Sequence, residues 1–445
     1  MRILIISTFF PPQNSIASHR PYSWAKYWSK AGHDVVVLTT PKNKLSAEPI
    51  IASQTGFHVV ERGYGSLMDW IINSYKTKQS TVVKAKPTNQ GHIKKALNRI
   101  FKKIDDFRIS RGIFHYRRFP DFSSYWAKNA IKWAISQKPW DIVISTYGPH
   151  TTHAVGYAVR TRNHAGYWIA DFRDLWTDDH IFKGMALFRG YEKWLERRYL
   201  SRADLITTVS EPLAQLLSAK SGKQCLTVEN GFEPADAVDL PQKNVFADRP
   251  NKVRIVYTGS IYRATRDPSP LFEAIRLIND SEIQSNLLAN LEVVFVGGNI
   301  EILNEMVSKY HVDPWVRLEG FVSRQTALMM QRDAHVLLFL ESNANGVDGI
   351  LTGKIFEYLS SGTPVWAIGN TIDSTPGQLV INSRGGAVFG NDSSKIKEAL
   401  ISLLQNFVKA QPQLNAEVLQ RYTRERLAMK LLNEALSDIR EKKRQ

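Results

Sequence analysis

The feature that most constrains the fold is a strand–helix alternation that runs through the chain twice. Continuous apolar runs rich in β-branched residues, such as RILIIST from residue 2 and DVVVLTT from residue 34, are separated by stretches with helical spacing, the first over about Tyr22–Ala31. Such runs are typical of buried parallel strands, which need crossover connections of this kind. The alternation restarts with RIVYTGS from residue 254. The sequence therefore predicts an α/β protein with two doubly wound, Rossmann-like domains.

The expected domain limits follow from this restart. A chain of 445 residues is longer than a single core usually supports. Residues 1–240 form the expected N-terminal domain, with an insertion at 76–118, and residues 250–415 form the second. The segment 234–252 has the Pro, Asp and Asn content of a linker. Residues 416–445 are expected to be helical and to cross back to the first domain. Ligands of parallel sheets bind beyond the strand carboxyl ends, so we expect the site in a cleft between the domains.

The positive charge of the chain is concentrated in the insertion. The net charge is +16, and thirteen Lys and Arg against two Asp give residues 76–118 a charge of +11. Apolar residues recur there at helical spacing, which predicts a basic amphipathic helix that contacts an anionic membrane surface. The alternative is a helix docked on its own domain. Nucleic acid is not an expected partner, because no stacking aromatic platform accompanies the charge. The candidate membrane residues are Lys94, Lys95, Leu97, Arg99, Ile100, Phe101, Lys102 and Lys103.

Several protein classes are disfavoured by what the sequence lacks. A single cysteine, Cys225, permits no intramolecular disulfide, which fits a reducing cytoplasm. The apolar runs are shorter than a membrane span, and the N-terminal run has no cleavage site of a signal peptide. Neither GxGxxG nor GxxxxGK[ST] follows the first strand, which argues against a dinucleotide dehydrogenase or a P-loop enzyme. We therefore expect a cytoplasmic protein, peripheral on the inner face of the cell membrane.

Two stretches of the second domain have the residue types of a phosphate site. In YTGSIYRATRDPSP, Gly259 allows the backbone to approach a ligand, and Arg263 and Arg266 offer planar donors to phosphate oxygens. A surface loop with two solvated arginines is the alternative.

The second stretch is GILTGKIFEYLSSGTPV, from residue 349. A helix that begins near Thr352–Lys354 presents unpaired amides, and Lys354 adds a full charge. Glu357, one turn further, can accept hydrogen bonds from a ribose. Lys354 is thus a candidate for the diphosphate and Glu357 for the ribose. The alternative is a half-exposed Glu357 that pairs with Lys354.

The first domain carries charged residues at expected strand ends. Asp171, Arg173 and Asp174 fall at the C-terminal end of the expected strand in GYWIADFRD, where they could bind a polar acceptor or shape a catalytic pocket. A structural salt bridge is the alternative. His150 closes another strand and could cap a helix. No metal site is expected, since no ligand set at metal spacing accompanies it.

Taken in order, the motifs make the chain resemble a glycosyltransferase of the GT-B fold, in glycosyltransferase family 4, over nearly its whole length. The carriers of this resemblance are the first strand with FFPP, ISTYGP, IADFRDLW, TTVSEPL, VENGF, IVYTGS, VVFVGG, VRLEGFVSR and KIFEYLSSGTPVWA, the last being the most specific. The central motifs look like those of a bacterial surface-polysaccharide subgroup.

The resemblance implies transfer of a hexosyl-type sugar from a nucleotide sugar, with retention and without a metal or other cofactor. UDP is the expected nucleotide of the donor, and GDP remains open. The acceptor would be a lipid-linked or other saccharide. Donor contacts would come from the second domain, and catalytic contacts from both. The implied donor residues are Gly259, Ser260, Arg263, Arg266, Leu351, Thr352, Lys354 and Glu357; the catalytic ones are Asp171, Arg173, Asp174, Arg266 and Lys354; the acceptor-side ones are Asn14, Ser15 and His150.

The sequence departs from the family pattern at four motif positions. Gly349 stands where the family has its first motif Glu, and Ser260 where a basic residue is usual. Asn14-Ser15 replaces a glycine-rich loop, and Arg173 replaces an active-site His. Lys354 and Arg263 could supply the missing contacts. Two other hypotheses stay open: a non-catalytic GT-B protein that binds nucleotide or glycan, and a basic nucleic-acid-binding protein.

Overall fold

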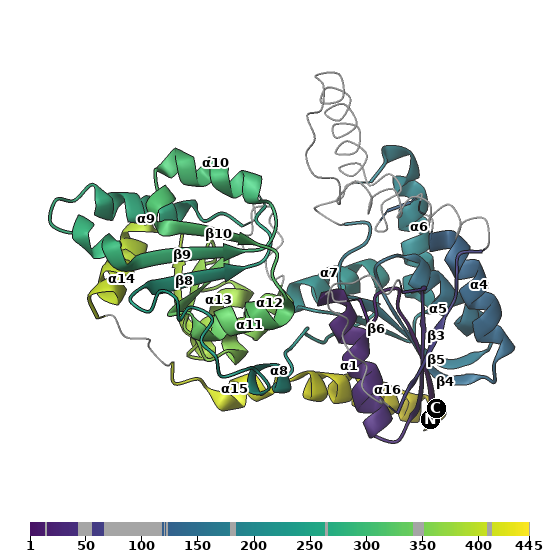
Figure 1. Cartoon of the computed structure of the whole chain (residues 1–445). Coiled ribbons are helices and arrows are strands. Elements are labelled where there is room, and N and C mark those ends of the chain that lie inside the picture. The colour runs from purple at the N-terminus through teal and green to yellow at the C-terminus, as the bar shows by residue number, and fades with distance from the viewer. Residues whose placement is uncertain are drawn as a thin grey trace, which may run out of the picture. The chain divides into compact units, whose positions relative to one another are not determined.

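The computed structural model describes residues 1–13, 16–42, 56–65, 118–119, 121, 123–178, 184–262, 266–340, 351–406 and 412–444. The chain divides into two compact units, Met1–Val228 with Ala428–Gln445 and Glu229–Leu427. Both chain ends lie at the first unit (Figure 1). Within the described ranges, no helix is long and apolar enough to cross a membrane.

The described part of the first unit contains a seven-stranded sheet in the order β3-β2-β1-β4-β5-β6-β7. Every neighbouring pair is parallel. The order reverses between β1 and β4, which makes their carboxyl ends the switch point of the sheet. The strands are β1 (Arg2–Ile6), β2 (Asp34–Thr39), β3 (His58–Glu61), β4 (Trp140–Thr146), β5 (Ala165–Phe172), β6 (Leu205–Thr208) and β7 (Cys225–Thr227); the helices are α1 (Ile16–Lys30), α4 (Ser123–Ser136), α5 (Thr151–Thr161), α6 (Ala186–Arg202), α7 (Glu211–Ser221) and, from residue 428, most of α16 (Arg424–Arg444).

The described part of the second unit contains a six-stranded parallel sheet in the order β10-β9-β8-β11-β12-β13. Its order reverses between β8 and β11. The strands are β8 (Val253–Thr258), β9 (Leu291–Val296), β10 (Val316–Gly320), β11 (Val336–Leu340), β12 (Val365–Ile368) and β13 (Gly386–Gly390). The helices are α8 (Ala235–Val238), α9 (Ser269–Asn279), α10 (Ile300–Tyr310), α11 (Arg324–Asp333), α12 (Gly353–Ser360), α13 (Thr375–Asn382), α14 (Ser393–Asn406) and α15 (Ala416–Gln420), with short 3-10 turns at Ser285–Asn290 and Asp313–Trp315.

The core of the second unit shows why its central strands are mostly apolar. Ile255 and Tyr257 belong to a buried cluster on one face of the sheet, together with Ile275 of α9. Val256 points to the other face, into a cluster with Ile355 of α12. Because alternate side chains enter different cores, a strand buried on both faces needs a nearly continuous apolar run. The prediction of two doubly wound α/β units is confirmed.

Two helices differ from the sequence-based expectation. We expected a helix over about Tyr22–Ala31, but α1 begins at Ile16 and contains Pro21. The single helix expected in residues 416–445 is two helices, α15 and α16. The break lies where Thr423 forms a bridge with Phe232, whose backbone exchanges hydrogen bonds with Tyr422 and Arg424. Long-range pairing thus interrupts a locally helical sequence.

The predicted linker 234–252 is part of the second unit. It contains α8, and Phe246 is buried in the core cluster beside Val256. The Val245 amide donates to an Asp333 carboxylate oxygen at 2.9 Å. The chain passes between the units at Val228–Glu229 instead, and returns at Leu427–Ala428.

Candidate functional site

Glycine turns follow β8 and β9 at the carboxyl edge of the second sheet. Gly259 has a φ of +140° and Gly297 a φ of +138°. A Cβ atom at position 259 would overlap Lys354 Nζ, and one at position 297 would overlap the Gly259 carbonyl oxygen. Glycine alone permits both the backbone angles and this approach. The two turns therefore present partly exposed main chain that carries no side chain. The Gly259 turn lies directly beside the Lys354 ammonium.

Lys354 is the second residue of α12 and is largely buried. Its ammonium donates a hydrogen bond to the Tyr257 hydroxyl at 3.0 Å and lies 4.2 Å from the centroid of that ring. The ring quadrupole attracts the cation, so Tyr257 holds the ammonium in place. The Lys354 side chain thus reaches back from its helix to the end of β8.

Arg266 brings a second cation to the same turn. Its Nη1 donates to the Ser260 carbonyl oxygen at 3.2 Å, and the Tyr257 hydroxyl donates to that oxygen at 3.0 Å. The Arg266 guanidinium also lies 5.2 Å from the Tyr262 ring centroid. Two cations are therefore connected, through one phenol and one carbonyl, around a glycine turn.

The start of α12 adds the partial positive charge of a helix N-terminus. Thr352 is its N-cap in extended conformation, but its side chain caps no backbone amide. The Thr352 hydroxyl oxygen is buried and has no hydrogen-bond partner among the described residues. The Leu351 carbonyl accepts from the Asn230 side-chain amide at 3.2 Å, which fixes the approach to the helix. The first amides of α12 thus remain uncapped by Thr352.

Glu357 lies one turn further along α12, but its partners differ from the alternative considered above. It accepts hydrogen bonds from Arg324 Nη1 at 2.9 Å and from Gln331 Nε2 at 2.7 Å. Gln331 Nε2 also donates to the Thr258 hydroxyl at 2.9 Å. Arg324 in turn contacts Asp236 at 2.8 Å. Glu357 is therefore oriented by α11, and a quarter of its side chain remains exposed.

Part of the predicted site lies outside the described residues. This applies to Arg263 and to the departure at Gly349 in the second unit, and to Asn14 and Ser15 after the first strand. It also applies to the eight candidate membrane residues between 94 and 103.

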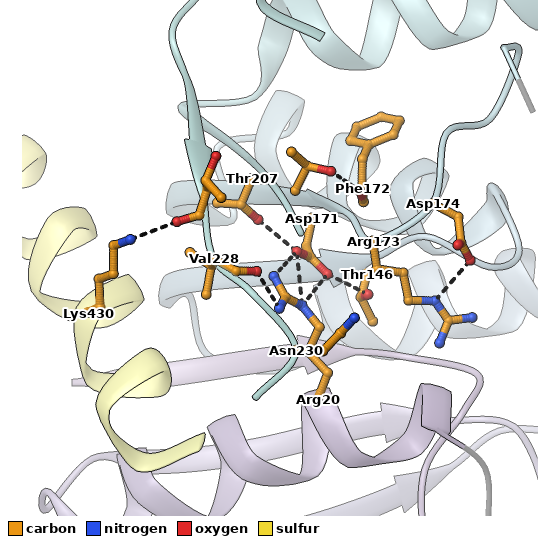
Figure 2. Close-up of polar contacts among 12 residues, drawn as sticks. Arg20, Thr146, Asp171, Phe172, Arg173, Asp174, Thr207, Val228, Asn230 and Lys430 are labelled. Atoms are coloured by element: carbon orange, nitrogen blue, oxygen red, sulfur yellow. Dashed lines mark hydrogen bonds and ion pairs between the residues drawn. The ribbon is translucent and has the colours of Figure 1, made fainter. Parts of the chain in front are cut away.

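Asp171 is a structural anchor of the first unit (Figure 2). Its carboxylate is fully buried and forms a two-oxygen ion pair with Arg20, the shortest contact being 2.7 Å. It also accepts from the Thr146 hydroxyl at 2.7 Å and the Thr207 hydroxyl at 2.8 Å. Arg20 Nη1 further donates to the Val228 carbonyl at 2.7 Å. This geometry matches the salt-bridge alternative and does not support a catalytic role for Asp171.

Arg173 and Asp174 lie beyond the end of β5, apart from the Asp171 cluster (Figure 2). Arg173 Nε is 3.7 Å from an Asp174 carboxylate oxygen. The Arg173 guanidinium lies 4.9 Å from the Phe9 ring, and a Cβ at Gly148 would come within 2.7 Å of its Nη2. Arg173 thus joins the residues that follow β1, β4 and β5 at the switch point.

His150 is a packing residue rather than a surface ligand. Its ring stacks on Trp176 at 4.7 Å between centroids, and both ring nitrogens lack hydrogen-bond partners among the described residues. Its Nε2 lies 3.9 Å from an Asp121 oxygen. Burial lowers the pKa of His150 and raises the pKa of Asp121, which favours the neutral form of both. A direct contact of His150 with an acceptor would require this packing to open.

Sequence reasoning missed the residues that position the site, namely Arg20, Tyr257, Arg324 and Gln331. Two of them carried a usable signal. Arg20 is a cation inside the apolar side of α1, and Gln331 is a fully buried amide in α11. Buried polar groups need partners, so both predict a buried network. Their partners, however, lie far away along the chain.

Comparisons with known proteins agree on the fold. No protein-family model and no curated protein sequence matches the chain. A sucrose-phosphate synthase from Thermosynechococcus elongatus is 14% identical, with a TM-score of 0.63 and coverage of 98% of both chains. A trehalose-6-phosphate structure from E. coli, bound with UDP-2-fluoro glucose, is 10% identical, with a TM-score of 0.59 and coverage of 98% and 99%. A Listeria monocytogenes protein described as a UDP-N-acetylglucosamine 2-epimerase is 13% identical, with a TM-score of 0.51 and coverage of 99% and 96%. Together with these similarities, the two α/β units of the present chain, each built on a parallel sheet, show that it has the GT-B fold.

Proposed function

We propose that the chain is a glycosyltransferase that moves a sugar from a nucleotide-sugar donor to an acceptor hydroxyl. The observation that carries this proposal is the Lys354 ammonium, held by Tyr257 beside the Gly259 turn at the start of α12. Positive charge, uncapped amides and exposed main chain are what a diphosphate requires. Glu357, with part of its carboxylate exposed, lies one turn away for the ribose. The UDP-2-fluoro glucose bound to a protein of similar fold supports UDP as the nucleotide of the donor.

In the proposed reaction the bond between the anomeric carbon and the diphosphate oxygen breaks, and its electron pair stays on the diphosphate. The acceptor hydroxyl oxygen bonds to the anomeric carbon on the same face and passes its proton to the leaving phosphate oxygen. Configuration is therefore retained. Lys354, Arg266 and the α12 N-terminus stabilise the charge that develops on the leaving group, which is the task a divalent cation has elsewhere. No carboxylate base is required, in agreement with the buried position of Asp171.

We further propose a lipid-linked saccharide acceptor at the inner face of the cell membrane, in polysaccharide biosynthesis. The basic segment 76–118 motivates this, and α6 adds support within the described residues. Leu187, Tyr191 and Trp194 are exposed on one side of this helix, where Arg198 lies 5.1 Å from the Trp194 ring. Exposed aromatic and basic residues together are typical of membrane-surface helices. We call these four residues the α6 face.

Donor binding can be tested by thermal unfolding with UDP, GDP, CMP or ADP. A nucleotide at one hundred times its dissociation constant adds about 2.7 kcal/mol to the stability of the folded state. We expect one nucleotide to raise the unfolding midpoint, and the rise to be lost in Lys354→Ala and reduced in Glu357→Gln. The matched controls are Lys395→Ala and Glu398→Ala on α14, which remove the same charges from the surface of the second unit. A midpoint that no nucleotide changes would contradict the donor site.

Turnover separates an enzyme from the non-catalytic alternative. Lys354→Ala is expected to lower the rate of donor cleavage about 10²-fold or more, the scale for losing one charge-stabilising donor. Nucleotide stabilisation without cleavage of any donor, with or without saccharide acceptors, would favour the binding protein. Nucleic-acid binding that survives Glu357→Gln would instead favour the third hypothesis.

A further inference from the structure

The first unit contains a polar cavity of about 510 Å³ that the proposed transfer reaction does not use. It is lined by residues that precede β5, β6 and β7, among them Arg160, Arg202 and Lys223, and by Lys442 of α16. Because these residues lie just before parallel strands, the cavity is at the amino edge of the sheet. Arg173 lies at the opposite, carboxyl edge. The volume is within the range of small-molecule sites in proteins.

The charge of the lining is strongly positive. Four cationic side chains face one carboxylate, that of Asp204. Asp204 pairs with Arg160 Nε at 2.6 Å and Nη2 at 3.1 Å, and it also accepts from the Trp168 amide at 2.9 Å. Lys442 Nζ lies farther away, 3.6 Å from the second Asp204 oxygen. Asp204 therefore neutralises Arg160 and leaves an excess of positive charge in the cavity.

Donor capacity remains after the observed hydrogen bonds. The Arg202 side chain has no hydrogen bond or ion pair among the described residues. The Lys223 ammonium donates to the Ser201 and Ala203 carbonyls at 2.8 and 2.7 Å, which uses two of its three hydrogens. Lys442 pairs with Asp438 at 2.9 Å, on its own helix. At least one guanidinium and one ammonium can thus donate to a bound anion.

The titration of Lys223 agrees with a crowded cationic site. Burial lowers its pKa; Asp204 opposes this effect, and the nearby charges of Lys442 and Arg202 lower the pKa further. Mutual repulsion among these cations is the condition under which a bound anion is most favourable. The carbonyl contacts keep Lys223 in the lining and so prevent it from swinging into solvent.

We propose that this cavity binds a phosphate-bearing anion, either a soluble phosphorylated metabolite or the phosphate headgroup of a lipid. Guanidinium and ammonium groups from α5, α6, α16 and the turn before β7 converge on one polar space, which suits several phosphate oxygens. A folded macromolecule does not fit a cavity of this size. The site is separate from Lys354, so it adds a second phosphate-dependent input to the protein.

The first test is calorimetric titration with inorganic pyrophosphate at constant ionic strength. It is done in a Lys354→Gln background, which removes the principal cation of the donor site. We expect Arg202→Gln with Lys442→Gln to weaken pyrophosphate binding tenfold or more. The control pair Lys132→Gln and Arg440→Gln removes the same charge from the first unit, and Arg440 lies on the same helix as Lys442; we expect a change of less than twofold. Equal affinity in the two double variants would overturn the proposal.

A second measurement identifies the source of the phosphate. Full-length protein is sedimented with vesicles of phosphatidylcholine, with or without phosphatidic acid. Loss of phosphatidic-acid binding in Arg202→Gln with Lys442→Gln, and competition by pyrophosphate, would identify a lipid headgroup. Unchanged vesicle binding together with weakened pyrophosphate binding would identify a soluble ligand. If neither ligand distinguishes this variant from the control pair, the cavity is not an anion site.

Discussion

At the scale of single residues, the Arg20–Asp171 pair gives the clearest prediction. Removing the Asp171 charge leaves a buried guanidinium without its counter-charge, which costs about 3–5 kcal/mol in comparable buried pairs. We therefore expect Asp171→Asn to lower the free energy of unfolding of the first unit by about that amount, as measured by urea denaturation. Asp174→Asn is the matched control. Its carboxylate is 37% exposed and 3.7 Å from Arg173, so we expect a loss below about 1 kcal/mol.

The same pair of variants decides between structure and catalysis. If Asp171→Asn kept the stability of the parent protein and lost transfer activity, the catalytic assignment that the geometry disfavours would be restored. The residue type and its place at a strand end were readable from the sequence. Its partner Arg20 lies 151 positions earlier, and no local pattern connects the two. Long-range ion pairs of this kind are the part of a site that a single sequence does not reveal.

At the scale of elements, the sequence predicts the strands and helices that depend on local residue patterns. A strand such as β8 is apolar at most of its buried positions, so its existence and its carboxyl end at Thr258 could be predicted, and with them the site of Gly259. The α15–α16 break could not be predicted. It depends on residues 231–233, where Gly231 has a φ of +64° and its Cα closely approaches the Tyr422 carbonyl. The local sequence of neither segment indicates that the two segments pair.

The sequence did not indicate that the apolar residues of the α6 face are exposed. Its opposite side is anchored by buried Glu192, 3.3 Å from Arg118, and by buried Glu196, 2.6 Å from Lys220. Both carboxylates of the helix are thus buried and ion-paired inside the unit. The outer side keeps the basic residues and the large apolar ones, with Leu187 82% exposed and Trp194 50% exposed. Such a surface favours an anionic bilayer.

Vesicle sedimentation with phosphatidylglycerol tests the α6 face. Each large apolar side chain that enters the bilayer contributes about 1.5–3 kcal/mol. We expect Leu187→Ser with Trp194→Ser to weaken binding tenfold or more at moderate salt. The control pair is Ile283→Ser with Phe321→Ser in the second unit, which removes two apolar residues that are more exposed still. Ile283 lies beside the acidic Glu282. An equal loss in both pairs would show that the α6 face has no special role.

At the scale of the whole molecule, the chain crosses between its two units twice. The second unit is one continuous segment, whereas the first needs residues 428–445 as well. Trp28, buried in α1, donates from its indole nitrogen to the Ala428 carbonyl at 2.9 Å. Leu431, Leu432 and Ala435 of α16 are also buried. The last helix is therefore part of the core of the first unit, not an appended tail.

A chain that ends at Leu427 is expected to lose the first unit and keep the second. The two buried leucines alone contribute about 3–6 kcal/mol, a large share of the roughly 5–15 kcal/mol that stabilises a whole domain. Scanning calorimetry of the shortened chain is expected to show one transition greatly lowered and one unchanged. The unchanged transition is the internal control, and it retains its shift with the donor nucleotide, since Lys354 and Glu357 lie in the continuous unit. If the first unit melted at the same temperature with and without residues 428–445, α16 would be dispensable, and the two crossings would be a matter of topology without energetic consequence.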